Sequence, residues 1–333
     1  MTIDDWYGAC AEAAAIIEKQ VPEVYRSRTF SGIIGDIKAL SPKKAQSLIA
    51  RKKGLGSQYA GLYLTCGIDQ GRGYQACASE ALGFVLGERK DDLLSGRVLD
   101  VGCAVGVTAG VLSLPRVTGF DLFPDLLRAA MLIDSLTGKK HDYAVADMTR
   151  DWPFACMFDA VVCGLVCHHL KDQSGILSFF SSANRVLLPG GSLVITLPAG
   201  SISYIRQLEN LMNALEKFGF VPEEDLSGMA LSTDNSHSLF WMFTLVFRKT
   251  GLSNGSIFIH PGFGFPEYRT PVSREEKGMQ ARSSVSRNRQ IRHQSFRFLS
   301  LEALVKACEE KALVFETVEE IRDLNDETKP LGI

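Results

Sequence analysis

The sequence predicts an α/β fold with a doubly wound, mostly parallel sheet, an N-terminal helical segment and a C-terminal appendage. From residue 97 onward, short runs of β-forming residues alternate with stretches of helical spacing, which is the pattern of parallel strands joined by crossover helices. The strand runs are almost continuously apolar, as expected where helices cover both faces of a sheet.

Six runs are predicted as strands of this sheet. They are RVLDVGC (97–103), VTGFDL (117–122), DYAVAD (142–147), FDAVVCGLV (158–166), SLVITLP (192–198) and LFWMFTLVFRK (239–249). Helical stretches fill the intervals at 124–138, 173–187 and 203–220, and the aromatic run 239–249 is predicted as the last strand of the sheet. Pro189, Gly190 and Gly191 are expected to form a turn between a helix and the fifth strand.

Three regions follow from this pattern. Residues 1–95 are expected to be helical, because AEAAAIIEKQ and YQACASEALGFVLGER have apolar residues at helical spacing. Residues 96–250 hold the sheet. Residues 251–333 form an appendage with an aromatic loop, an Arg-rich stretch, an amphipathic helix at 300–312 and a strand at 313–318.

Composition indicates a globular protein without a membrane span. The 333 residues are 46% hydrophobic, and no apolar run approaches the roughly 20 residues that cross a bilayer. Eight cysteines without a C-x-x-C pair favour reduced thiols over a disulfide framework. The N-terminus has no basic segment of the kind that starts a signal peptide, so a cytoplasmic location is expected. Nothing in the sequence indicates an oligomeric state.

Charge is unevenly distributed, although the net charge is only −2. Residues 26–53 contain eight Lys and Arg against the single acid Asp36, and residues 269–297 contain seven Arg and one Lys against two Glu. Such runs are commonly solvated faces, and they are also the pattern of a surface that contacts RNA phosphates.

A glycine turn lies where the first strand changes into a helix. The run DVGCAVG places Asp100, Gly102 and Gly106 at this point, where backbone N–H groups and a helix N-terminus face a ligand. Ala104 breaks the G-x-G-x-x-G pattern of dinucleotide sites, and the G-K-[ST] of P-loops is absent. A tight turn without a ligand is the alternative interpretation of these glycines.

The same run resembles the first motif of class I S-adenosylmethionine-dependent methyltransferases, D/E-x-G-x-G-x-G. Asp100, Gly102 and Gly106 match the motif, and Ala104 replaces its middle glycine. GFDLFPDLL, VADMTRDWPF, CHHLKD and NRVLLPGGSLVIT resemble later motifs of this family, in order, over roughly residues 97–250. The resemblance implies a seven-stranded sheet and S-adenosyl-L-methionine as cofactor.

It also implies cofactor contacts at particular residues. Asp121 would bind the ribose hydroxyls, Asp147 the adenine amino group, and Met148 the adenine ring. Leu122 and Gly164 complete the expected set, beside the residues of the glycine turn. Helix capping is the alternative role for the two carboxylates.

His168 and His169 follow the fourth strand, at the edge where ligands bind in such sheets. The near-neutral pKa of histidine suits a general base, and a structural role is the alternative. Zinc held by Cys163, Cys167 and the two histidines is disfavoured, because a second ligand pair at zinc spacing is missing.

Aromatic residues outside the motifs are candidates for the acceptor side. Tyr59, Tyr63 or Tyr74 reaches the site if residues 1–95 form a lid or acceptor-binding region, as the resemblance implies; Tyr59 and Tyr63 also have the spacing of a packed pair on one helix face. Phe263, Phe265 and Tyr268 either line an acceptor pocket or pack the appendage onto the sheet. Asp159, at the start of the fourth strand, is expected to be structural.

The sequence favours methyl transfer to an O or N nucleophile of a small-molecule metabolite. CHHLKD resembles small-molecule enzymes, whereas the N-P-P-Y-type stacking motif for nucleobase amines is absent. An RNA methyltransferase that uses the basic segments 26–53 and 269–297, and a non-catalytic cofactor-binding module, are the alternatives.

Overall fold

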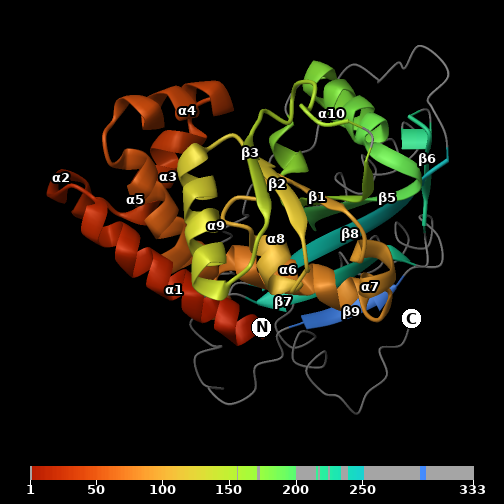
Figure 1. The fold of residues 1–333 in the computed structure, drawn as a ribbon, viewed down its shortest axis with the longest axis horizontal. Helices are drawn as coiled ribbons and strands as arrows, with labels where there is room; N and C mark the ends of the chain where they lie inside the picture. The colour runs from red at the N-terminus through yellow and green to blue at the C-terminus, as the bar shows by residue number, and fades with distance from the viewer. Residues whose placement is uncertain are drawn as a thin grey trace, which may run out of the picture.

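The computed structural model describes residues 2–155, 157–170, 173–199, 215–216, 218–223, 226–233, 239–250 and 293–297. Within them the strands form one sheet in the order β3-β2-β1-β4-β5-β8-β7-β9, and the short strand β6 also pairs with β8. Helices pack on both faces (Figure 1). The predicted doubly wound architecture is confirmed.

The strands are β1 (Val98–Val101), β2 (Val117–Asp121), β3 (Asp142–Val145), β4 (Phe158–Gly164), β5 (Leu187–Ala199), β6 (Phe220–Pro222), β7 (Gly228–Thr233), β8 (Leu239–Lys249) and β9 (His293–Arg297). The α-helices are α1 (Ile3–Gln20), α2 (Glu23–Arg26), α3 (Phe30–Lys38), α4 (Pro42–Arg51), α5 (Leu55–Leu62), α6 (Tyr74–Leu86), α7 (Arg89–Leu94), α8 (Val107–Val111), α9 (Pro124–Thr137) and α10 (Gln173–Val186). A π-helix (Tyr63–Ile68) and 3₁₀ turns (Asp69–Gly71, Cys167–His169) complete the described elements.

Strands β1 to β5 are parallel, and β8 runs antiparallel between β5 and β7. All four residues of β1 are buried, because helices cover both faces of this central strand. The segment 239–249 lies inside the sheet, and the prediction that it is the last strand is wrong, since β9 follows it along the chain and pairs with β7. The order β3-β2-β1-β4-β5-β8-β7 is the seven-stranded core, and β6 and β9 are additions.

The segment Pro189–Gly191 is not a turn between helix and strand. It lies inside β5, which starts directly after α10. The register with β4 shifts between Phe158 and Ala160, and Gly190 has a φ of +76°. The glycines thus accommodate an irregularity within paired strands.

Each face of the sheet has its own hydrophobic core. Side chains of α10 and a group of phenylalanines, including Phe120 and Phe158, pack on one face. Helices α1, α6, α8 and α9 pack on the other. Trp6 of α1 lies so close to α8 that a Cβ at Gly110 would be 2.0 Å from its ring, so the N-terminal helices share a core with the sheet.

Residues 1–95 are helical as predicted, from α1 to α7. Most of the helix expected at 203–220, the aromatic loop with Phe263, Phe265 and Tyr268, the basic segment up to residue 292, and the helix and strand expected beyond residue 299 lie outside the described residues. No described helix is long and apolar enough to span a membrane.

Candidate functional site

The candidate site lies at the carboxyl edge of the parallel strands, where the loops after β1, β2, β3 and β4 meet. The strand order reverses between β1 and β4, and ligands of doubly wound sheets bind at such a switch point. The loops after these two strands touch: a Cβ at Gly102 would lie 2.6 Å from Val166 Cγ2. Because glycine has no side chain, position 102 allows the two loops to approach this closely.

The turn after β1 contains three residues in the left-handed region. Their φ angles are +67° at Gly102, +49° at Ala104 and +78° at Gly106. Left-handed backbone costs an L-residue such as Ala104 about 1–2 kcal/mol, so its surroundings must hold it there. The N–H of Ala104 donates to Asp121 Oδ2 at 3.0 Å.

Three other N–H groups of this turn also donate inside the protein. Those of Gly102 and Cys103 donate to Phe120 O at 2.8 and 3.0 Å, and that of Gly106 donates to Cys103 O at 2.8 Å. The expectation that the turn's N–H groups face a ligand is therefore wrong for Gly102, Ala104 and Gly106. The glycines instead leave room for close approach to the backbone.

Asp121 ties the turn to the end of β2. Its Oδ1 accepts from Phe123 N at 2.9 Å and its Oδ2 accepts from Ala104 N at 3.0 Å. The residue is 8% exposed, and burial raises the pKa of its carboxyl to about 6, against the opposing effect of backbone N–H donors. A carboxylate oxygen accepts more than one hydrogen bond, so Asp121 has capacity for ligand hydroxyls.

Asp100 is the more deeply buried carboxyl, at 1% exposure. Burial raises its pKa to about 7, the hydroxyl of Thr108 opposes this by hydrogen bonding, and the charge of Asp121 adds to it. Its Oδ2 has no hydrogen-bond partner among the described residues. A buried acceptor without a donor fits the ammonium group of S-adenosylmethionine, and Asp121 fits the ribose hydroxyls.

The predicted adenine-side residues lie just after the ends of β2 and β3. Leu122 O accepts from Gln46 Nε2 at 2.7 Å. Asp147 Oδ1 accepts from the N–H and hydroxyl of Thr149 at 2.9 and 2.6 Å, which is a local turn contact of the kind expected for a capping role. Met148 packs against the phenylalanine-rich core. Contact of these residues with adenine stays a prediction.

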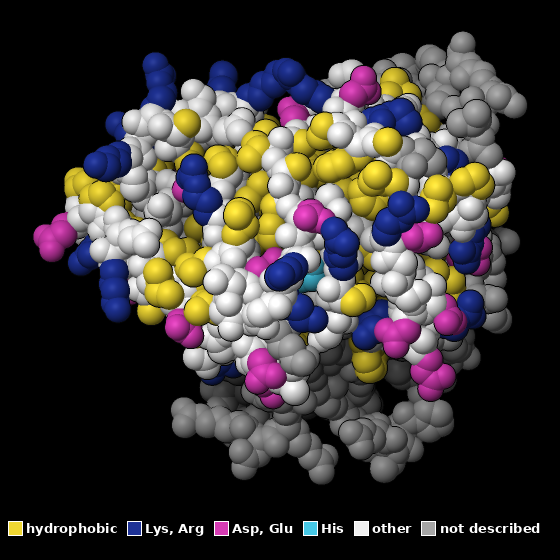
Figure 2. Space-filling view, viewed as in Figure 1, with side chains coloured by type: hydrophobic (Ala, Val, Ile, Leu, Met, Phe, Trp, Pro, Cys, Tyr) yellow, Lys and Arg dark blue, Asp and Glu magenta, His cyan; other side chains and the backbone are white. Residues whose placement is uncertain are grey.

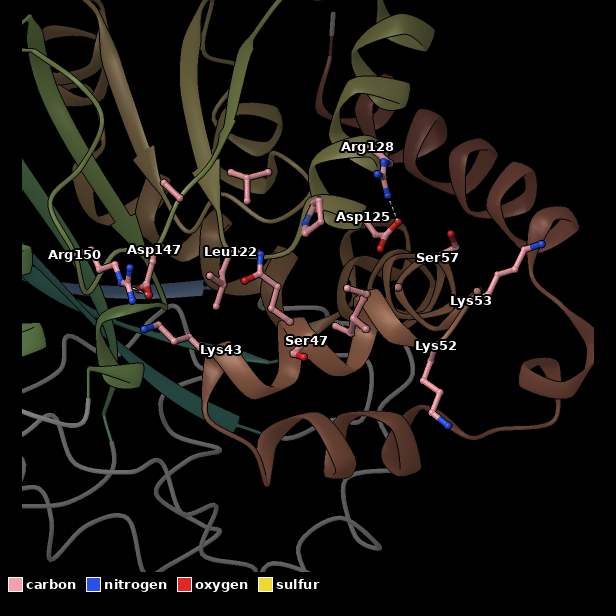
Figure 3. Close-up of a pocket in the computed structure, with 18 residues that line it drawn as sticks. Lys43, Ser47, Lys52, Lys53, Ser57, Leu122, Asp125, Arg128, Asp147 and Arg150 are labelled. Carbon is pink, nitrogen blue, oxygen red and sulfur yellow. Dashed lines mark hydrogen bonds and ion pairs between the residues drawn. The ribbon is translucent and has the colours of Figure 1, made fainter.

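An open groove borders these residues. It has a volume of about 980 Å³ and is walled by α4 and the start of α5 on one side, and by the ends of β2 and β3 and the start of α9 on the other (Figure 3). Leu122 and Asp147 line it. The motifs do not predict the α4 wall of this groove, although the basic composition of residues 26–53 is a signal for it.

The loop after β4 holds the two predicted catalytic residues. The 3₁₀ turn Cys167–His169 places the His168 and His169 rings 4.0 Å apart, with His169 the more exposed. Gly164, at the end of β4, lies beside α8, where its Cβ would be 3.3 Å from Thr108 Oγ1. The contact of Val166 with Gly102 places this loop beside the glycine turn.

The alternative of a zinc site receives no support. Cys163 and Cys167 are buried with their Sγ atoms 3.1 Å apart. Across the described residues, no group of three or more His, Cys, Asp or Glu side chains is arranged to hold a metal.

Three tyrosines surround the carboxylates. Tyr59 and Tyr63 pack edge to face at 6.3 Å, as their spacing predicts, and Tyr59 contacts Phe123. Burial, with nearby negative charge including that of Asp121, raises the pKa of both. Tyr143 was missed by sequence analysis: its Oη would be 3.1 Å from a Cβ at Gly106.

Asp159 behaves as a structural residue, because its carboxylate accepts from Arg97 N at 2.7 Å at the opposite end of β1.

Comparisons with known proteins agree with this geometry. A family model described as a methyltransferase domain matches residues 99–195. A ubiquinone biosynthesis O-methyltransferase of Chromobacterium violaceum is 30% identical over 167 residues, covering 43% of this chain and 71% of that protein. One of Xylella fastidiosa is 35% identical over 109 residues, covering 31% of this chain and 42% of that protein, so the chain spans less than half of this relative.

Solved structures similar to the chain include the YcgJ protein of Bacillus subtilis, with a TM-score of 0.40 and 12% identity over 51% of this chain and 98% of that chain. A putative methyltransferase from Bacillus halodurans has a TM-score of 0.37 and 19% identity over 47% of this chain and 93% of that one. Taken with the motif and the C. violaceum relative, the family match shows that the chain belongs to the class I S-adenosylmethionine-dependent methyltransferases.

Proposed function

We propose that the enzyme transfers a methyl group from S-adenosylmethionine to the oxygen of a small-molecule acceptor. The relatives named above are O-methyltransferases of ubiquinone biosynthesis, which supports an oxygen acceptor and a small molecule. The observation that carries the proposal is the buried pair Asp100 and Asp121 at the switch point, with Asp100 Oδ2 lacking a donor among the described residues.

In this proposal, residues at and after the ends of β1, β2, β3 and β4 hold the cofactor. Asp100 binds the ammonium group and Asp121 the ribose hydroxyls. The turn with Gly102, Ala104 and Gly106 lets the ligand approach the backbone, and Gly164 closes the site from β4. Leu122, Asp147 and Met148 form the adenine side.

When bound, the cofactor supplies a methyl group on a positively charged sulfur, which departs as a neutral thioether. The protein's contribution is to hold the acceptor in line, which is worth on the order of 7–11 kcal/mol, and to take the hydroxyl proton. His168 and His169 are the candidates for that base, because both lie on the loop that touches Gly102 through Val166. General-base assistance contributes about 10²–10⁴-fold.

The test is incubation with methyl-labelled S-adenosylmethionine and separated small-molecule and RNA fractions of a cell extract. We expect label in the small-molecule fraction, and less label with the Asp100→Asn variant, which should bind the cofactor more weakly. Label in RNA alone would favour the RNA alternative. Label in neither fraction, from protein that binds the cofactor, would favour a non-catalytic module.

A further inference from the structure

Two threonine hydroxyls on one face of the sheet are buried without a hydrogen-bond partner. Thr196 of β5 is 1% exposed and Thr244 of β8 is 0% exposed, and among the described residues neither Oγ1 atom has a donor or an acceptor. The two residues are direct partners in the antiparallel β5–β8 pair, so their side chains project from the same face with Cβ atoms about 5 Å apart. Unpaired buried hydroxyls lower stability, so a pair of them indicates that a partner binds there.

The threonines belong to a row of small residues that crosses four strands. Thr196 pairs with Gly164 of β4, and Thr244 pairs with Gly228 of β7. Figure 1 shows these four strands in one sheet, and their order is β4-β5-β8-β7. This threonine row, Gly164, Thr196, Thr244 and Gly228, therefore contains no side chain larger than threonine.

Apolar side chains border the threonine row on both sides along the strands. On the side of the amino ends of β4 and β5, Val162, Val194 and Val246 belong to the core that α1, α8 and α9 cover. On the side of the carboxyl edge, Met242 packs with Leu165 and with helix α6. The threonine row is thus a polar strip between two apolar clusters.

The row meets the cofactor residues at its β4 end. Gly164 is partly exposed, and among the described residues a Cβ there would have only Thr108 Oγ1 within 4 Å, at 3.3 Å. The hydroxyl of Thr108 hydrogen-bonds Asp100, the proposed partner of the ammonium group. The proposed ribose and adenine contacts, Asp121 and Asp147, lie on the other side of β1, at and after the ends of β2 and β3. A molecule over the threonine row therefore adjoins the cofactor on the side away from adenine.

We propose that the threonine row binds a second oxygen of the methyl acceptor, one that does not receive the methyl group. This inference rests on the proposed methyl transfer and adds the chemistry of its acceptor. The hydroxyls of Thr196 and Thr244 both donate to this oxygen, because a carbonyl oxygen has two lone pairs and accepts two hydrogen bonds. Leu165 and Met242 contact the apolar part of the acceptor.

The buried setting selects an uncharged group. A carboxylate in this position would need a cation beside it. Of the described residues, Lys249 is the one buried cation, and its Nζ already donates to Asn184 O and Leu187 O at 2.6 and 2.7 Å. The Lys and Arg side chains seen in Figure 2 lie on the surface. The acceptor is therefore expected to be an apolar molecule that carries a neutral oxygen besides the hydroxyl that is methylated.

The test compares two phenols of similar shape. Meta-hydroxyacetophenone carries a carbonyl oxygen besides its hydroxyl, and meta-ethylphenol lacks that oxygen. Calorimetry measures the binding of each phenol to protein saturated with S-adenosylhomocysteine, for wild type, for Thr196→Val, for Thr244→Val and for the double valine variant. The matched controls are Thr196→Ser and Thr244→Ser, which keep the hydroxyl, and Thr118→Val, at a half-buried threonine of β2.

Wild type is expected to bind meta-hydroxyacetophenone about tenfold more tightly than meta-ethylphenol, from two hydrogen bonds worth about threefold each. Each valine variant should lose about threefold of this preference, and the double valine variant should lose all of it. The serine variants and Thr118→Val should keep it. Without a phenol, the valine variants should melt at the same temperature as wild type or higher, because an unpaired buried hydroxyl has been removed.

Equal affinity of wild type for the two phenols, or no binding of either, overturns the proposal. A preference that the double valine variant keeps also overturns it. S-adenosylhomocysteine has no methyl group to transfer, so the measurement does not depend on catalysis. The expected preference in a protein that transfers no methyl group would therefore refute the proposed function alone.

Discussion

Cofactor affinity should rise steeply with pH because two buried carboxyls must ionise to receive a cation. Burial raises the pKa of Asp100 to about 7 and that of Asp121 to about 6. If only ionised carboxylates bind, the competent fraction of Asp100 is about 0.1 at pH 6 and about 0.9 at pH 8, and that of Asp121 rises from about 0.5 to about 1. The product predicts about 20-fold tighter binding of S-adenosylmethionine at pH 8 than at pH 6.

The same shifts act with the opposite sign on the stability of the cofactor-free protein. Because both pKa values are raised above those of the unfolded chain, the folded protein binds more protons between about pH 4 and pH 7. The contribution of Asp100 and Asp121 to stability is therefore fully present below about pH 4 and is lost as the pH rises through 6 and 7. Adding the cofactor should reverse this trend.

Isothermal titration at constant ionic strength, in two buffers of different ionisation enthalpy, measures both the affinity and the protons released. Proton release near pH 6.5 is expected. The Asp100→Asn variant, which cannot ionise at this position, should bind more weakly at pH 8 and keep only about a twofold pH dependence. Affinity that is flat with pH, or that falls from pH 6 to pH 8, would refute the assignment of these carboxyls to a cation.

Four further variants test the turn after β1, the histidine pair and the N-terminal core. Gly102→Ala places a Cβ against Val166 in left-handed backbone, so it should lower the melting temperature and the cofactor affinity through about 1–2 kcal/mol of backbone strain plus the overlap. His168→Ala and His169→Ala should keep cofactor affinity, and the variant that lacks the base should lose about 10²–10⁴-fold in kcat; losses under about tenfold in both remove the general base. Trp6→Ala should cost about 3–5 kcal/mol in denaturant unfolding, and a cost below about 1 kcal/mol would contradict the shared core.

The central strands and the carboxylates at their ends could be predicted from sequence alone. Continuous apolar runs identify strands buried on both faces, and the carboxyl ends of parallel strands necessarily meet at one edge. Asp100 and Asp121 therefore come together with no further information. Tyr59 and Tyr63 contact each other as predicted, because residues four apart lie on the same face of a helix.

Contacts between segments that are far apart in the sequence could not be predicted from local patterns. Gln46 reaches Leu122 across 76 residues, and Thr108 reaches Asp100 only because α8 folds back over β1. The placement of β8 inside the sheet depends on pairing partners that no local pattern encodes. The use of the turn's N–H groups by Phe120 likewise follows from the register of β1 and β2.

A crystal structure of the protein with S-adenosylhomocysteine tests the central claim most directly. The ligand is expected along the turn from Gly102 to Gly106, with its ribose on Asp121 and its amino group on Asp100. A ligand bound away from both carboxylates would contradict the account.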